Sequence, residues 1–103
     1  MKYKPVSGRD GSLQAYVETS YVKLVELFGE PNSGGDNYKV STEWILEDEE
    51  GKVVTIYEYK TTNSYDSGAM SVEAFRALPS FNWHIGAEGA LEATRLKHFI
   101  ESK

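Results

Sequence analysis

Residues 44–60 read Trp44-Ile45-Leu46-Glu47-Asp48-Glu49-Glu50-Gly51-Lys52-Val53-Val54-Thr55-Ile56-Tyr57-Glu58-Tyr59-Lys60. This stretch decides the fold, because apolar and polar side chains alternate on either side of an acidic turn, as they do in a β-hairpin. The loop Glu49-Glu50-Gly51 has glycine where a three-residue turn needs a positive φ. We therefore predict a hairpin that pairs residues whose numbers sum to 100.

This register predicts which side chains face the core. The face that we assign to the core carries the pairs Leu46 with Val54, Trp44 with Ile56, and Val40 with Lys60. The other face carries Ser41, Glu43, Ile45 and Glu47 opposite Tyr59, Tyr57, Thr55 and Val53. A slip of one residue would mix the two faces, which a half-buried sheet disfavours. Glu58 falls at the end of the core face, where a carboxylate is unexpected.

Helix and strand signals alternate along the rest of the chain. Ser20 suits a helix N-cap, and Gly29 followed by Pro31 suits the end of that helix. The further predicted elements are a strand over 13–19, a helix over 72–78 capped by Ser71, a strand over 81–85 and a helix over 89–101. The apolar stripe of this last helix is expected to consist of Leu91, Leu96, Phe99 and Ile100. This order predicts an α+β fold: an antiparallel sheet of three to four strands, with two main helices on one face and one short extra helix.

Length and composition indicate one domain over residues 1–103, with 1–12 loosely ordered. The chain has no cysteine, which fits a reducing compartment. Its first ten residues have no apolar run, and no stretch approaches membrane-spanning length. We therefore expect a cytoplasmic protein without a signal peptide or membrane segment.

The net charge of −5 is unevenly distributed. Eight acidic and two basic residues lie between Glu30 and Glu58. This distribution argues against direct nucleic-acid binding, which requires clustered lysine and arginine. The acidic turn is open to two interpretations: a solvated loop, or a prong that enters a basic groove on a partner. The prong would consist of Glu47, Asp48, Glu49 and Glu50.

Residue types that perform catalysis are sparse. Cysteine is absent, and the only histidines, His84 and His98, occur in no spacing typical of a metal site or a catalytic triad. Both remain weak metal candidates. The acidic residues cluster where water would screen them, whereas a general acid needs an apolar pocket. We expect no enzymatic activity and no cofactor.

The face of the sheet that turns away from the core is the second candidate contact surface. If Trp83 packs inward, the alternation of its strand places His84 beside Glu43, Tyr57 and Tyr59 on that face. Tyrosine is common in interface hot spots because it combines a large ring with a polar tip. The alternative is that these rings only support one another across strands.

Several blocks together resemble small proteins encoded by bacteriophages and other viruses. These blocks are Leu27-Phe28-Gly29-Glu30-Pro31, Lys39-Val40, Glu43-Trp44, Gly51 to Lys60 (GKVVTIYEYK) and Trp83-His84-Ile85-Gly86. The resemblance spans about Leu13 to Ile100. The chain departs from it over Asn63 to Ser80, which includes the extra short helix.

Accessory proteins of this kind often antagonise host immunity, and this small acidic chain is similar in type to anti-CRISPR proteins. The resemblance implies an inhibitor that binds a host defence protein, such as a CRISPR nuclease, and blocks its nucleic-acid-binding surface. The expected contact residues are Glu43, Glu47, Asp48, Glu49, Glu50, Tyr57, Tyr59 and His84. The alternatives are a small-molecule or metal-ion binding protein and a phage housekeeping interaction module.

Overall fold

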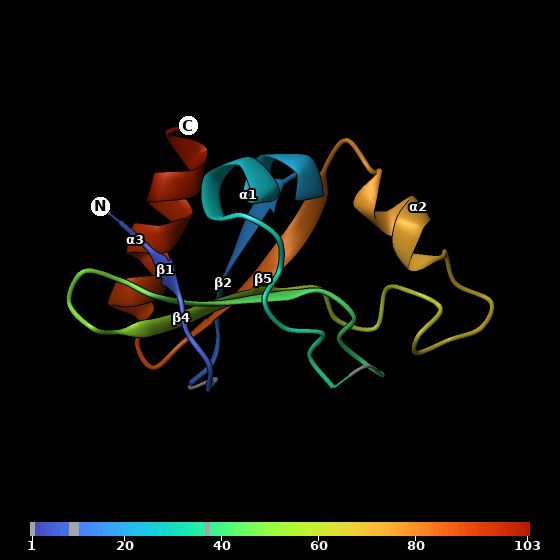
Figure 1. The fold of residues 1–103 in the computed structure, drawn as a ribbon, viewed down its shortest axis with the longest axis horizontal. Helices are drawn as coiled ribbons and strands as arrows, with labels where there is room; N and C mark the ends of the chain where they lie inside the picture. Colours follow the sequence, from blue (N-terminus) through green and yellow to red (C-terminus); the bar gives the residue numbers. More distant parts are fainter. Residues whose placement is uncertain (1, 9–10, 37) are drawn as a thin grey trace.

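The computed structural model describes residues 2–8, 11–36 and 38–103, and these form an α+β fold. The elements are, in chain order, β1 (Lys4–Pro5), β2 (Ser12–Thr19), α1 (Tyr21–Phe28), β3 (Glu43–Glu47), β4 (Val53–Tyr57), α2 (Val72–Arg76), β5 (Phe81–Ala87) and α3 (Ala90–Glu101). The strands form one antiparallel sheet in the order β1-β3-β4-β5-β2. Helices α1 and α3 lie on the same face of the sheet, and α2 lies beyond its end (Figure 1).

The hairpin of β3 and β4 has the register that the sequence predicts. Trp44 pairs with Ile56 and Leu46 pairs with Val54, and all four side chains are buried. Gly51 has a φ of 79° in the turn, a conformation that glycine adopts without steric strain. The alternation of apolar and polar residues therefore identified the pairing and the face that packs in the core, although Ile45 and Thr55 on the other face are buried as well.

Strands β3 and β4 are shorter than predicted, and the register slips between Glu58 and Lys60. Lys60 has a φ of 58°, and its N–H donates to the carbonyl oxygen of Lys39 at 2.6 Å. Val40 was predicted to face the core opposite Lys60. It is instead buried outside the core cluster, on the other face of the sheet.

Strand β1 makes the number of strands five, where the sequence indicates three or four. Lys4 and Pro5 pair with the edge of β3. A two-residue strand shows no alternation, and proline is tolerated at a sheet edge because it need not donate a ladder hydrogen bond. The N-terminal segment 1–12 thus contributes a strand, although three of its residues lie outside the described part. Tyr3 packs its ring against Phe99, with centroids 5.2 Å apart.

Two buried tryptophans fix α1 against the sheet. The rings of Trp44 and Trp83 meet edge to face, with centroids 5.5 Å apart. The Trp44 indole N–H donates to the Gly29 carbonyl oxygen just after α1, at 2.8 Å. The Trp83 indole N–H donates to the Thr19 carbonyl oxygen just before the predicted N-cap Ser20, at 3.1 Å. Both ends of α1 are therefore held by hydrogen bonds from the core.

Helix α2 closes one end of the core. It lies in the segment 63–80, where the chain departs from its resemblance, and Ser71 caps it as predicted. Phe75 of α2 is buried, with its ring centroid 4.8 Å from that of Phe81 and 5.1 Å from that of Trp83. The additional helix therefore has a clear packing role.

Helix α3 begins after Gly89 as predicted, but the prediction of its buried face is partly wrong. Ala93, Leu96 and Ile100 are buried, whereas Leu91, expected in the apolar stripe, is 58% exposed. At 100° per residue Leu91 lies on the side of the helix opposite Leu96.

Of the helices in the described part of the chain, none is long and apolar enough to cross a membrane.

Candidate binding pocket on the outer face of the sheet

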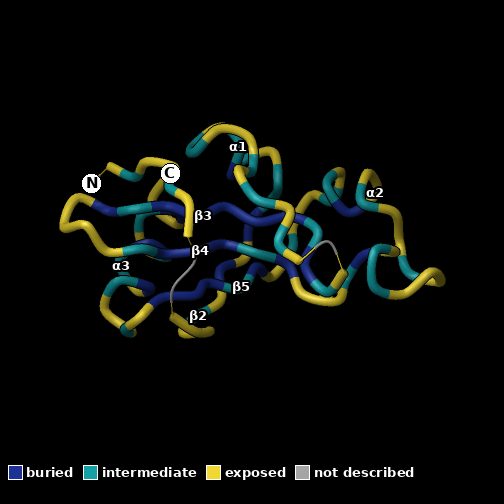
Figure 2. Tube along the Cα trace, turned by 60° about the horizontal axis from the view of Figure 1, so that its bottom comes forward, coloured by how far each residue is buried: buried dark blue, intermediate teal, exposed yellow. Residues whose placement is uncertain are grey.

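The face of the sheet opposite α1 and α3, here called the outer face, carries a row of aromatic and polar side chains. Figure 2 shows its strands β3, β4, β5 and β2 side by side. Tyr57 pairs with Glu43 on one side and His84 on the other, and His84 pairs with Tyr16. The predicted placement of His84 on the same face as Tyr57 and Glu43 is therefore confirmed.

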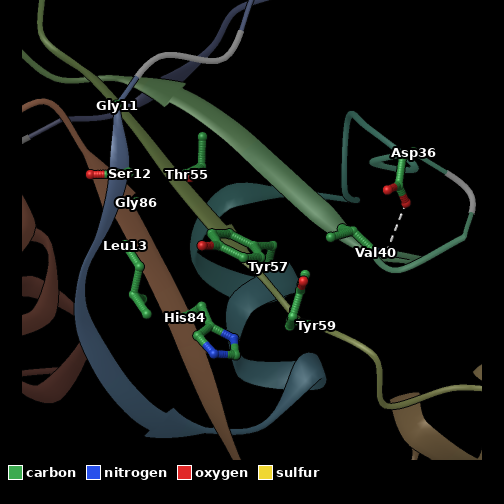
Figure 3. A pocket seen from close by; sticks show the side chains of 10 residues that line it. All are labelled: Gly11, Ser12, Leu13, Asp36, Val40, Thr55, Tyr57, Tyr59, His84 and Gly86. Atoms are coloured by element: carbon green, nitrogen blue, oxygen red, sulfur yellow. Dashed lines mark hydrogen bonds between the residues drawn. The ribbon is translucent and has the colours of Figure 1, made fainter. Parts of the chain in front are cut away.

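A pocket of about 360 Å³ lies on this face. We call it the outer-face pocket. It is lined by Gly11, Ser12, Leu13, Asp36, Val40, Thr55, Tyr57, Tyr59, His84 and Gly86 (Figure 3). Strands β4 and β5 form its floor, while β2 and the loop that carries Asp36 form its sides. Four stretches distant in sequence thus meet here, and the volume is within the range of small-ligand sites.

Three tyrosine rings surround the imidazole of His84. The ring of Tyr57 stacks on it, with an interplanar angle of 16° and centroids 5.2 Å apart. Tyr59 is nearly perpendicular to it at 80° and 6.1 Å, and Tyr16 is tilted at 5.0 Å. Tyr16 and Tyr59 are 45% and 42% exposed. The cluster therefore presents large aromatic surfaces to solvent, although its members also support one another.

Gly86 keeps the floor of the pocket open. A Cβ atom at this position would lie 2.6 Å from Thr55 Oγ1 and 3.4 Å from a ring carbon of Tyr57. Any other residue would therefore push against the floor and occupy space in the pocket. Glycine here reflects close packing beside the pocket, in agreement with the absence of an unusual φ.

Burial lowers the pKa of His84 below its ordinary value of 6.5, because the charged ring would lose hydration. The backbone of Tyr57 and the charge of Glu58 act in the opposite direction. Among the described residues, the buried Nδ1 of His84 forms no hydrogen bond of ordinary geometry, although the Tyr57 backbone lies close enough to favour the protonated ring. At neutral pH the ring is therefore uncharged.

Asp36 is the only carboxylate among the lining residues that the structure describes. Its Oδ1 accepts hydrogen bonds from the backbone N–H groups of Val40 at 3.0 Å and Tyr38 at 2.9 Å. These bonds hold the pKa of Asp36 below its ordinary value, so the group is ionised at neutral pH. The lining includes no lysine or arginine among the described residues, and the described part of the lining is therefore negatively charged.

Glu43 is not available as a contact residue, although it lies on the predicted face. Its side chain is fully buried, because the loop before β3 folds over it. Ser33 forms a β-bridge with Glu43, and the Ser33 hydroxyl donates to Glu43 Oε1 at 2.9 Å. The sequence pattern placed the side chain on the correct face but did not reveal the loop that covers it.

The acidic turn is largely engaged in contacts within the chain. Asp48 is only 5% exposed, and its Oδ1 accepts from two backbone N–H groups in the turn. Glu47 forms an ion pair with Lys4, and Glu50 forms one with Arg95. Glu49 accepts a hydrogen bond from the backbone of residue 2. The four predicted prong residues therefore have local roles, and they lie apart from the outer-face pocket.

The two histidines do not combine into a metal site. His84 is on the outer face, whereas His98 is on α3, which covers the opposite face. No group of three or more metal-ligating side chains of His, Asp or Glu comes together in the part of the chain that the structure describes. Nor does any hydrogen bond within the described residues join His84 to a hydroxyl or carboxylate that it could activate.

Three parts of the pocket were not predicted to line it: Asp36, Val40 and residues 11–13, where β2 begins. Their positions depend on how loops fold over the sheet, and no local periodicity encodes this. Two local signals for these parts were present in the sequence: the glycine pair before Asp36, and the position of Leu13 in an alternating strand.

The chain matches no protein-family model and no curated protein. The functional conclusion therefore depends on the geometry and chemistry of the outer-face pocket.

Proposed function

We propose that the chain acts by binding a protein partner through the outer-face pocket and the rings around it, without catalysis. The observation that carries this proposal is the cluster of Tyr16, Tyr57, Tyr59 and His84 on the face that α1 and α3 leave uncovered. Partly exposed aromatic rings around a concave site are typical of interface hot spots. A structural role alone does not require two of these rings to remain more than two-fifths exposed.

The partner that the resemblance implies is a host defence protein, such as a CRISPR nuclease. By covering its nucleic-acid-binding surface, the chain would act as an anti-CRISPR-like inhibitor. The net charge of −5 supports a basic partner, because complementary charge accelerates encounter. Nucleic-acid-binding surfaces are rich in lysine and arginine.

The outer-face pocket is a better candidate contact than the acidic turn. Side chains of the turn already accept hydrogen bonds or form ion pairs within the chain. A partner would have to replace these contacts, so the gain in free energy would be smaller. The exposed ring of Tyr16 requires no such exchange, and at Tyr59 a partner would meet only a cation–π contact with Lys60.

Binding to a captured defence protein tests this proposal. We expect a tagged chain to recover such a protein from host lysate, and the purified pair to bind in calorimetry. Replacing Tyr59 by alanine should weaken the affinity by about tenfold or more, the loss typical of a hot spot. Tyr38→Ala is the matched control, because Tyr38 is 52% exposed and is not among the residues that line the pocket.

Two results would reject the outer-face assignment or the proposal. If Tyr59→Ala binds as tightly as the unmodified chain while Glu49→Gln weakens binding, the acidic turn is the contact. If no defence protein is recovered and the chain does not protect phage during infection of a defended host, the inhibitor role fails.

A small-molecule binding protein is the second candidate. The pocket volume of about 360 Å³ favours it, since known ligand pockets begin near this size. Thermal-shift measurements of the chain with a library of metabolites distinguish this candidate function from the first. A ligand that binds the pocket while no protein partner competes for it would favour this second function.

A further inference from the structure

The rings of the outer-face pocket are arranged as a corner. Tyr57 and His84 are nearly parallel, at 16°, and Tyr59 is nearly perpendicular to His84, at 80°. Figure 3 shows these three side chains grouped at one end of the pocket, with Asp36 projecting from the loop on the far side. Aromatic faces at an angle to one another, together with a carboxylate, are the components of sites that bind organic cations.

The described charged groups near the corner are two carboxylates and, beside Tyr59, the Lys60 ammonium, so their balance favours a cation over an anion. Asp36 is ionised, and Glu58 is close enough to His84 to act on it electrostatically. The imidazole is uncharged at neutral pH and therefore does not repel a positive ligand. None of the described lining residues is a lysine or an arginine.

One ring of the cluster already contacts a cation within the chain. The Lys60 ammonium nitrogen lies 5.2 Å from the ring centroid of Tyr59 and 5.1 Å from that of Tyr65. These distances are typical of cation–π contacts. Lys60 itself does not line the outer-face pocket, so its contact with Tyr59 lies beside the pocket.

We propose that the outer-face pocket binds an organic cation, an alkylammonium or guanidinium group, against the ring cluster of Tyr57, Tyr59 and His84, with Asp36 as the counter-charge. This inference deepens the proposed function, on which it rests. The cation is either a free small molecule or the end of a lysine or arginine side chain on the partner. A volume of about 360 Å³ accommodates either source.

Choline and its neutral carbon isostere, 3,3-dimethylbutan-1-ol, test the role of charge, since the two ligands have nearly the same shape. In NMR titrations of the intact chain, choline should shift the ring resonances of Tyr57, Tyr59 and His84. Its affinity should exceed that of the alcohol by about tenfold, a typical effect of cation–π contact in a partly desolvated site.

A second experiment, with short blocked peptides that contain lysine or arginine, identifies the source of the cation. Tighter binding of a peptide than of choline assigns the cation to a protein partner, and the reverse assigns it to a free molecule.

Two variants separate the ring and the carboxylate contributions. Tyr59→Leu keeps an apolar side chain but removes the aromatic face, and Asp36→Asn removes the charge while keeping an oxygen that can accept from Val40 and Tyr38. Each should weaken choline binding by about fivefold to tenfold. Asp66→Asn is the matched control, because Asp66 accepts a backbone hydrogen bond from Gly68 in another exposed loop. The backbone spectrum of each variant confirms that it is folded.

Equal affinity for choline and the alcohol, or no binding of any cation by the folded chain, would overturn this inference. The proposed function would still stand if Tyr59→Ala abolished partner binding in the same samples. Conversely, cation binding in the pocket with partner binding unaffected by Tyr59→Ala would support the inference and reject the outer-face contact.

Discussion

Glu58 illustrates how a single residue that breaks the hydrophobic pattern is accommodated. The hairpin register places its side chain toward the core, and it is fully buried there. Its carboxylate accepts hydrogen bonds from the backbone N–H and the hydroxyl of Ser41 and from the backbone N–H of Thr61. A buried carboxylate with several donors is tolerated, whereas an unpaired one is not. Glu58 thus joins the loop before β3 to the loop after β4.

We expect the Glu58→Ala variant to lose about 2–4 kcal/mol of unfolding free energy, because the donors around the carboxylate would remain buried without an acceptor. Glu26→Ala, at an exposed position of α1, should change it by less than about 0.5 kcal/mol. Urea denaturation of both variants measures the difference. Equal effects of the two substitutions would mean that the donors find water in place of Glu58.

His84 should make the stability of the fold depend on pH. Its pKa in the folded chain is below the ordinary 6.5, so the unfolded chain takes up a proton first as the pH falls. The contribution of His84 to stability is therefore fully present above about pH 6.5 and is lost as the pH falls through the folded pKa. The faces of Tyr16, Tyr57 and Tyr59 and the carboxylate of Glu58 surround the group that titrates.

The difference between the unmodified chain and His84→Phe isolates this effect, because phenylalanine keeps a ring beside Tyr57 and does not titrate. We expect the unmodified chain to lose stability relative to this variant as the pH falls below about 6.5 in urea denaturation. His98→Gln, on α3, should retain the pH dependence. A parallel pH dependence in the His84→Phe variant would show that other groups cause it.

At the scale of elements, α1 shows how local signals and core contacts combine. Ser20 and Gly29 bound the helix as the sequence predicts, and Gly29 donates to the Val25 carbonyl oxygen at 2.8 Å. An isolated helix of eight residues would be marginal in water. The indole hydrogen bonds of Trp44 and Trp83 supply the additional stability by attaching both ends to the sheet.

We expect Trp44→Phe to lower the unfolding free energy by about 1–3 kcal/mol, because an aromatic ring remains but the hydrogen bond to Gly29 is lost along with part of the packing. Hydrogen exchange should accelerate most at the C-terminal end of α1. Tyr21→Phe is the control, since it removes only an exposed hydroxyl contact with Glu30 and should change stability by less than about 0.5 kcal/mol. Uniform acceleration throughout the chain would argue that Trp44 acts through packing alone.

For the whole molecule, the unequal distribution of charge affects how a partner is approached. The acidic turn of β3 and β4 lies beside α3, at one end of the sheet, where Glu50 pairs with Arg95 (Figure 1). Surface ion pairs of this kind contribute little to stability. Their charges can still steer a basic partner, even though the contact itself would be made at the outer face.

We expect a double variant with Glu49→Gln and Glu50→Gln to associate with a basic partner several-fold more slowly, while its dissociation rate stays unchanged. Stopped-flow measurements at low and high salt distinguish steering from contact, because added salt should reduce the difference between the two chains. A faster dissociation of the double variant would instead place the acidic turn inside the interface. Unfolding free energy should change by less than about 1 kcal/mol.

Local patterns predicted much of this molecule. The alternation in residues 44–57 identified the register of the hairpin and its buried face, and Ser20, Gly29 and Ser71 marked helix boundaries. The same alternation placed His84 and Tyr57 on one face. Such patterns succeed because they reflect interactions between residues close in sequence or directly opposed across a short turn.

Only the tertiary structure decided how the loops lie on the sheet. The Asn32 side chain shows the reason: its amide donates to the Val6 and Ile45 carbonyl oxygens, and its oxygen accepts from the Ile45 N–H. These contacts hold the loop before β3 across the sheet, where it covers Glu43 and brings Asp36 to the pocket. The sequence by itself determined the β3–β4 hairpin, its register as far as Tyr57 and the side of the hairpin that packs in the core. Contacts between distant residues determined which side chains on the outer face stay accessible. The position of a loop on the sheet depends on the residues against which it packs, and these are not encoded in the loop's own sequence.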